Sequence, residues 1–347
     1  MSHFIQTCFR QNHTSTPPVW FMRQSGRYLP EYQALRKNQS GNFINFCQNP
    51  DNAYAATMIP LKRYNLDASI VFSDILVIVD AMGLDINWDH GPYLAQPITQ
   101  PKHIDTLADH QAHTRLNYVY QTIQRIKQDG PDLPCIGFSG SPWTIAAYML
   151  DHNPSKRASE RFVSARSFIY SHPKAAETLL AKLSEIITRY TCEQIEAGAD
   201  AICLFDSWGH LLSHQQYEDY GYYYLNQITQ HLQRAYPHIP VIIFGRHLSP
   251  YLEMIRDIPC QVVGLDWTVD LHRAQEILGP DKAIQGNLDN AILMSKPDKI
   301  AEHTQKLLKQ QMDNPGFILN LGHGILPQTP PEHIETILRS VRTFHQA

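Results

Sequence analysis

The residues from Pro17 to Tyr32, PPVWFMRQSGRYLPEY, include the side chains best suited to binding anions. Arg23 and Arg27 lie four residues apart, with Gly26 between them. Guanidinium groups are permanently charged and form paired hydrogen bonds with carboxylates and phosphates. An arginine pair in a surface loop is usually solvated, but aromatic residues flank this one, and buried charge is costly without an anionic partner. The segment therefore predicts a site for several carboxylates or phosphates.

A second candidate is Asp74, which lies between the apolar runs 70–72 and 75–78. A carboxylate in such surroundings is either neutralised by a partner or retained for function. Aspartate is also a favoured N-cap residue of helices. The sequence leaves both interpretations open, and one residue can fill both roles.

Two further candidates follow apolar runs near a glycine or a helix start. His323 lies between Gly322 and Gly324, so we expect its imidazole to lie in an open loop. Tyr148 comes one helical turn after Thr144, and we expect its phenol to point towards the same site. The other histidines lie mostly in polar or helix-like segments, and we expect them at the surface.

The stretch around Asp206, Ser207 and His210 contains the residue types of a hydrolase triad. A nucleophile elbow has the pattern Gly-x-Ser-x-Gly, and Ser207 lacks the preceding glycine, so we discount this interpretation. The serines at 139 and 141 are better explained by an ordinary turn into a helix.

Metal and cofactor signatures are absent from the sequence. No Cys-x-x-Cys pair, phosphate loop or dinucleotide fingerprint occurs, and the cysteines are not spaced like metal ligands. We therefore expect a site without a metal or a cofactor, and we expect the six cysteines to be buried free thiols.

The composition also limits the partners. With 43% hydrophobic and 18% charged residues, the 347-residue chain is typical of a globular protein. A net charge of −4 argues against a broad nucleic-acid-binding surface, so we expect no nucleic-acid partner. Asp74 and Asp80 interrupt the most apolar stretch, and no apolar leader opens the chain, so we expect no membrane span and no secretion.

Eight short apolar runs precede most of these polar groups. They are rich in Val, Ile and Phe and nearly continuous, which is typical of strands buried on both faces of a parallel sheet. The runs are Val19–Met22, Ala68–Phe72, Cys135–Phe138, Ala201–Phe205, Val241–Phe244, Val262–Leu265, Lys282–Gln285 and Phe317–Leu321. Helix-like stretches alternate with them, at 50–64, 173–196, 213–235, 270–278 and 331–344, and 84–102 reads as an irregular insertion.

This alternation fits a (β/α)₈ barrel or a doubly wound open sheet. The polar residues decide between them, because in a closed barrel the carboxyl ends of the strands converge on one mouth. Such residues end nearly every run, Arg246 and Asp266 among them. We therefore predict an α/β protein with a single domain over residues 1–347, a (β/α)₈ TIM-like barrel whose active site lies at the C-terminal mouth of the strands.

Six motifs in order resemble those of the uroporphyrinogen decarboxylase family: PVWFMRQSGRYLPEY, GFSGSPWTIAAYM, FSDIL, FDSWGH, QGNLD and NLGHGILPQTPPEH. They extend over residues 17–333, nearly the whole chain. Ser25, where the family usually has alanine, and the pair Gly209-His210 depart from the common pattern. The resemblance implies a distorted (β/α)₈ barrel that is homodimeric and cytoplasmic and needs no metal or organic cofactor.

Enzymes of this family convert the acetate side chains of uroporphyrinogen III to methyl groups in haem biosynthesis, giving coproporphyrinogen III and CO₂. The resemblance implies catalytic roles for Asp74, Arg23 and His323. It implies substrate contacts from Arg23, Gln24, Ser25, Gly26, Arg27, Asp74, Tyr148, Ser207 and His323, with Arg36 as a further member of the cationic set.

The residues themselves agree with this chemistry. A pyrrole ring protonated on carbon can accept the electrons of the breaking C–C bond, and a buried carboxylate such as Asp74 stabilises the resulting cation. The proton donor stays open, because a permanently charged guanidinium such as that of Arg23 is a poor acid.

Two other functions fit part of the sequence. A corrinoid- or thiol-linked methyltransferase of the same fold normally needs metal ligands, which the sequence lacks. A non-catalytic tetrapyrrole-binding protein would keep the arginines but would not need Asp74. Release of CO₂ distinguishes the decarboxylase from both.

Overall fold

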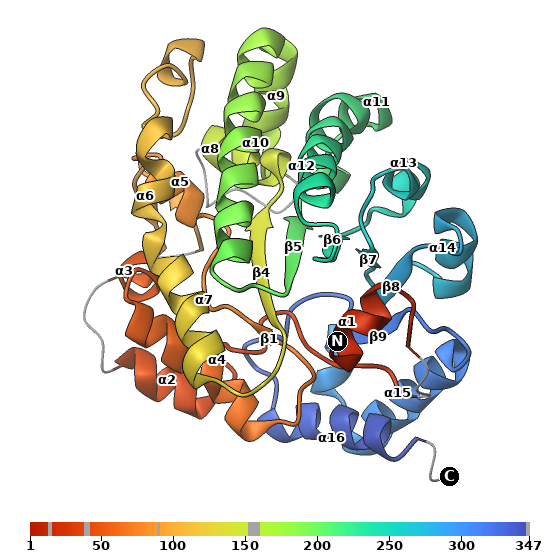
Figure 1. Ribbon diagram of the computed structural model, residues 1–347. Coiled ribbons are helices and arrows are strands. Elements are labelled where there is room, and N and C mark those ends of the chain that lie inside the picture. The colour runs from red at the N-terminus through yellow and green to blue at the C-terminus, as the bar shows by residue number, and fades with distance from the viewer. Residues whose placement is uncertain (13–15, 38–41, 89–90, 152–159, 345–347) are drawn as a thin grey trace.

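The computed structural model describes residues 1–12, 16–37, 42–88, 91–151 and 160–344 (Figure 1). Seven parallel strands form one curled sheet in the order β1-β4-β5-β6-β7-β8-β9, with helices around its outside. The strands are Ser69–Ile70 (β1), Cys135–Gly140 (β4), Ala201–Asp206 (β5), Val241–Gly245 (β6), Val262–Gly264 (β7), Ala283–Leu288 (β8) and Phe317–Leu321 (β9). The predicted α/β barrel-like fold is confirmed.

Val19 occupies the place between the two edge strands. It forms a parallel bridge with Leu319 of β9, whose N–H donates to the carbonyl of Pro18 at 3.0 Å. On its other side the N–H of Asp67, just before β1, donates to the Val19 carbonyl at 2.9 Å. Val19 therefore completes a ring with the seven strands.

The prediction of a full strand at Val19–Met22 is wrong, since only Val19 pairs. Proline has no N–H, so Pro18 cannot extend the ladder on one side. On the other side the chain leaves the ring at Arg23, which has a φ of 61°. The other seven predicted strands are present, although β1 keeps two residues of the run predicted at 68–72.

The helices pack mainly around the sheet, and α10 lies beside α8, α9 and α12 (Figure 1). The α-helices are α1 (His3–Cys8), α2 (Pro30–Lys37), α3 (Phe43–Cys47), α4 (Pro50–Arg63), α5 (Val77–Ala81), α6 (Ala112–Arg115), α7 (Asn117–Asp129), α8 (Pro142–Leu150), α9 (Val163–Ser171), α10 (Pro173–Glu196), α11 (His214–Gln216), α12 (Tyr223–Ala235), α13 (Leu252–Arg256), α14 (Leu271–Leu278), α15 (Pro297–Gln311) and α16 (Pro331–Arg342). The 3₁₀ turns are η1 (Pro101–His103), η2 (Asp109–Gln111), η4 (Gly209–Leu211), η6 (Ser249–Tyr251) and η7 (Asn290–Met294), and η5 (Tyr217–Tyr222) is a π-helix.

Two segments differ from expectation. The continuous helix predicted at 213–235 is divided into α11, η5 and α12. Tyr217 packs directly on Gly221 within η5, where a β-carbon would lie 2.8 Å from the tyrosine ring, so a local π-turn accommodates the contact. The insertion at 84–102, expected to be irregular, contains a short antiparallel pair, Ile86–Asn87 (β2) and Tyr93–Leu94 (β3).

The sheet is buried on both faces, as its continuous apolar runs predict. Every residue of β4, β6 and β9 is buried. All six cysteines are free thiols; Cys192 is half-buried and the other five are buried. In the described ranges, no helix is both long and apolar enough to cross a membrane.

Candidate active site

The candidate site lies where the parallel strands end. Arg23 follows Val19, Asp74 follows β1, Ser207 follows β5, Arg246 follows β6 and His323 follows β9. Because all strands of the ring run parallel, these residues lie at the same edge of the sheet, the edge that carries the active site in barrels of this kind.

Asp74 is a half-buried carboxylate in a tight turn. Its Oδ1 accepts a hydrogen bond from the N–H of Leu76 at 2.9 Å. Helix α5 begins at Val77, and its N-cap residue is Leu76, so the interpretation of Asp74 as the N-cap is wrong. Burial raises the pKa of Asp74 to about 6, although the backbone hydrogen bond and the charge of Arg23 act in the opposite direction. The carboxyl group is therefore largely ionised above that pH.

Arg23 has a left-handed backbone and lies against the loop after β9. Its φ of 61° is uncommon for a residue with a side chain. The side chain packs against the α-carbon of Gly324, where a β-carbon would lie 2.7 Å from Arg23 Cγ. The charge of Arg23 lowers the pKa values of Asp74, Tyr148 and His323. Arg23 thus acts electrostatically on three of the predicted site residues at once.

His323 is half-buried, and its ring centroid lies 6.3 Å from that of Phe244. Burial, together with the charges of Arg23 and Arg246, lowers its pKa to about 3, so the imidazole is neutral at physiological pH. The expectation of an open loop is wrong, because a β-carbon at Gly322 would lie 2.6 Å from the backbone nitrogen of Trp267. The flanking glycines permit close packing rather than exposure.

Tyr148 projects from α8 into a group of aromatic rings. Its ring lies 5.1 Å from Phe162 and 6.3 Å from Trp208, and the Arg161 guanidinium is 5.7 Å from its centroid. Burial raises the pKa of Tyr148, and among the smaller effects the charge of Asp74 also raises it, whereas those of Arg161 and Arg23 lower it. The phenol is therefore a neutral hydrogen-bonding group within electrostatic range of Arg23 and Asp74.

Ser207 is held between two anchored neighbours. Asp206 is fully buried and accepts hydrogen bonds from Ser141 at 2.6 Å and Thr144 at 3.3 Å. Trp208 donates its N–H to Thr144 Oγ1 at 3.2 Å. The prediction of a structural role for Ser141 is confirmed, since Ser141 is also the N-cap of α8. In the described part of the chain no hydrogen bond joins Asp206 to a histidine, which agrees with discounting a hydrolase triad.

The remaining residues of the arginine loop make other contacts. Gln24 is buried and donates to the carbonyl of Ala68 at 3.3 Å, and Ser25 donates to the carbonyl of Ala56 at 2.7 Å. These side chains therefore anchor the loop, and their contact with a substrate stays a prediction, as does that of Gly26.

The two other predicted cations lie towards α2. Arg27 is exposed, and its charge acts on Tyr32. Arg36 lies over the Phe46 ring, with its guanidinium carbon 4.7 Å from the centroid. Their binding roles therefore stay predictions, supported less directly than the role of Arg23.

Two histidines expected at the surface are half-buried near these residues. The rings of His210 and His247 lie 5.3 Å apart, and His247 Nδ1 is 3.4 Å from the buried carboxylate of Asp266. Burial and the charges of His247 and Arg246 lower the pKa of His210 to about 4. The place of Arg246 and Asp266 at strand ends signals their proximity to the site, whereas no local pattern marks the two histidines.

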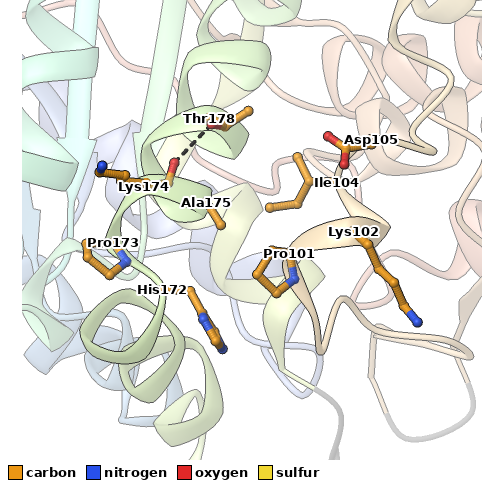
Figure 2. Close-up of a pocket in the computed structure, with 9 residues that line it drawn as sticks. All are labelled: Pro101, Lys102, Ile104, Asp105, His172, Pro173, Lys174, Ala175 and Thr178. Atoms are coloured by element: carbon orange, nitrogen blue, oxygen red, sulfur yellow. Dashed lines mark hydrogen bonds between the residues drawn. The ribbon is translucent and has the colours of Figure 1, made fainter.

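A surface groove lies elsewhere, between η1 and the start of α10 (Figure 2). It has a volume of about 590 Å³ and contains none of the predicted site residues. Its lining residues are Pro101, Lys102, Ile104, Asp105, His172, Pro173, Lys174, Ala175 and Thr178. Among the described residues no group of three or more histidines, cysteines or carboxylates could hold a metal ion.

Comparison with known proteins decides the family. The family model described as "Uroporphyrinogen decarboxylase (URO-D)" matches residues 2–344. The chain belongs to this family. A uroporphyrinogen decarboxylase of Legionella pneumophila (strain Lens) is 42% identical over 343 residues, covering 98% of this chain and 96% of that protein. The uroporphyrinogen decarboxylase of Vesicomyosocius okutanii is 40% identical over 334 residues, covering 95% of each chain. The family predicted from the motifs is confirmed.

Solved structures support the fold of this uroporphyrinogen decarboxylase family member. A methyltransferase from Methanosarcina mazei matches with a TM-score of 0.78 over 99% of this chain and 100% of that chain, at 19% sequence identity. A B12-independent methionine synthase from Shewanella sp. W3-18-1 matches with a TM-score of 0.58 at 11% identity, covering 89% of each chain. At such low identity the likeness concerns the fold alone.

Proposed function

We propose that this chain decarboxylates the four acetate side chains of uroporphyrinogen III, giving coproporphyrinogen III and four molecules of CO₂. Each step takes up one proton: the acetate group loses CO₂, and a methyl group replaces it. Membership of the uroporphyrinogen decarboxylase family over nearly the whole chain supports this carboxy-lyase activity.

The proposed mechanism uses the substrate ring as the electron acceptor. Protonation of a pyrrole carbon makes the ring cationic, and the electrons of the breaking C–C bond then flow into the ring as CO₂ leaves. Protonation of the exocyclic carbon forms the methyl group, and loss of the added ring proton restores the pyrrole. Since the ring itself accepts the electrons, the proposal requires no metal or organic cofactor.

Asp74 is the observation that carries the proposal. A half-buried carboxylate with a pKa raised to about 6 is ionised at physiological pH, although its surroundings disfavour the charge. In our proposal it accepts hydrogen bonds from pyrrole N–H groups and stabilises the cationic ring. Such preorganised charge is most effective where water is excluded.

Three neighbours of Asp74 complete the proposed catalytic group. Arg23 binds a substrate carboxylate, because its charge reaches the same region as Asp74. Tyr148 and His323, both neutral, donate hydrogen bonds to substrate oxygen atoms. Arg27, Ser207 and the backbone of 24–26 would provide further substrate contacts.

The proposal extends to assembly and location. We propose that residues 1–347 act as one domain, that the protein forms a homodimer and that it works in the cytoplasm, as the family resemblance implies. Sedimentation of the purified protein would test the homodimer directly, because a monomer and a dimer of a 39.8 kDa chain differ twofold in mass.

The decisive experiment is turnover of uroporphyrinogen III under anaerobic conditions, with both CO₂ and the porphyrinogen products measured. We expect CO₂ and coproporphyrinogen in a ratio of four to one, unchanged by exhaustive chelation. Binding of the tetrapyrrole without release of CO₂ would favour the carrier. Loss of activity on chelation and its recovery with zinc would favour the methyltransferase-like alternative.

A further inference from the structure

Two arginines approach His323 from opposite strands of the ring. Arg23 follows Val19 and Arg246 follows β6, which is the fourth neighbour of Val19 in either direction around the ring. The charges of both arginines lower the pKa of His323. The two guanidinium groups therefore reach the same region from opposite sides.

The residues on either side of Arg246 fix its position. Phe244, at the end of β6, packs 6.3 Å from the ring of His323. His247 packs 5.3 Å from the ring of His210 and contacts Asp266. Arg246 lies between these two anchored residues, so its backbone is held where the strands end.

Arg246 itself has no anionic partner. It is half-buried, and its buried Nε makes no hydrogen bond with any described residue. None of the ion pairs among the described residues involves Arg246 or Arg23.

The nearby acid is already engaged. Asp266 accepts hydrogen bonds from the backbone N–H of His247 and from the N–H and hydroxyl of Thr268. A partly buried guanidinium that lacks a carboxylate is unfavourable by itself, because burial removes part of its hydration. Its surroundings are therefore suited to an anionic group that arrives with a ligand.

We propose that Arg246 binds a carboxylate arm of the substrate on the side of the site opposite Arg23. The inference rests on the proposed function, because uroporphyrinogen carries eight carboxylates around its ring. A flat polyanion needs cations on more than one side to be held in one orientation. Arg23 and Arg246 together would fix that orientation over Asp74, and Arg246 would act as a binding and positioning residue.

The test compares Arg246→Gln and Arg246→Lys with Arg273→Gln as a matched control. Arg273 is exposed on α14, and its Asp270 contact is through the backbone, so its replacement changes the net charge equally without touching the site. We expect Arg246→Gln to raise KM for uroporphyrinogen III at least about tenfold with little change in kcat, because a charge-assisted contact is lost. Arg246→Lys, which keeps a point charge, should be intermediate, and Arg273→Gln should match the parent.

A second measurement checks the placement of Arg246 without substrate. The His323 pKa, followed by NMR, should rise in Arg246→Gln and stay low in Arg246→Lys, because only the first removes a neighbouring positive charge. A purely structural effect on stability would not separate the two variants in this way.

The outcomes are distinguishable. If the parent protein does not decarboxylate uroporphyrinogen III, the proposed function fails. If the parent is active and Arg246→Gln keeps its KM, or if Arg273→Gln raises KM equally, the role of Arg246 is rejected while the function stands. A fall in kcat at unchanged KM would likewise reject carboxylate binding by Arg246.

Discussion

The side chain of Arg23 lies across the α-carbon of Gly324. A β-carbon at Gly324 would lie 2.7 Å from Arg23 Cγ and 3.0 Å from its Nε. Real β-carbons do not approach other atoms so closely, so the absence of a side chain at Gly324 leaves the space that Arg23 occupies. The loop after β9 and the loop after Val19, far apart in sequence, are thus fitted to each other at the proposed site.

We predict that Gly324→Ala moves Arg23 rather than unfolding the protein. The atoms in conflict belong to a flexible side chain, which can shift with little loss of stability. Thermal denaturation should therefore change slightly, while kcat/KM for uroporphyrinogen III should fall about tenfold or more, since small misplacements of binding groups are costly.

A double-mutant cycle provides the control for this prediction. If Gly324→Ala acts through Arg23, it should have little further effect in an Arg23→Ala background. Additive losses in kcat/KM would show that alanine at 324 disturbs the site independently of Arg23.

Replacing Asp74 separates catalysis from folding. Asp74→Asn keeps an oxygen that can accept the Leu76 hydrogen bond but removes the negative charge. We expect kcat to fall about 10²–10³-fold, the loss typical of removing a preorganised charge from a transition state. Asp74→Glu keeps the charge one methylene further out and should also lose activity, through misplacement.

The melting temperature of Asp74→Asn should equal or exceed that of the parent above about pH 6. The pKa of Asp74 is raised in the folded state, so its ionisation is unfavourable to folding, and this penalty grows as pH rises from the unfolded-state pKa through about 6. A fully active Asp74→Asn enzyme would leave Asp74 with only a role in the turn.

The pH dependence of activity should reflect Asp74. If its charged form is required, kcat/KM should fall as the pH drops through about 6, since the carboxyl is protonated below that pKa. The charge of Arg23 lowers this pKa. Arg23→Gln should therefore move the acid limb to higher pH, in addition to weakening binding. An acid limb at the same pH in both proteins would assign it to another group.

His323 should remain neutral across the physiological range. Its pKa is lowered to about 3, so its NMR signals should not titrate between about pH 8 and about pH 5, where an ordinary histidine gains a proton. The same measurement on His103, which is outside the proposed site, provides a reference within the protein. A His323 transition near neutral pH would contradict the buried, doubly cationic surroundings described above.

Much of the fold is evident in local patterns. The apolar runs that form β4, β5, β6 and β9 have no polar interruption, and buried parallel strands need this property along their whole length. Helix α10 begins at Pro173 and ends before Ala197-Gly198, as its proline and glycine signals predict. These features depend on interactions between neighbours in the chain, so they can be predicted from the sequence.

The site is only partly evident in this way. Asp74 stands out because a carboxylate among apolar residues is unusual, and Arg23 stands out through its motif. The pairing of Arg23 with Gly324 and the approach of Arg246 towards His323 involve residues from opposite parts of the chain. No local periodicity encodes such contacts.

The sequence by itself determined the order of strands and helices, the family and the residues placed at strand ends. Tertiary structure alone decided that one residue, Val19, closes the ring and that His323 is packed rather than open. It also decided which cations lie near Asp74. The physical reason is that closure of the ring brings together strand ends that are distant in sequence, and burial and charge at their meeting point then set the pKa values of the site.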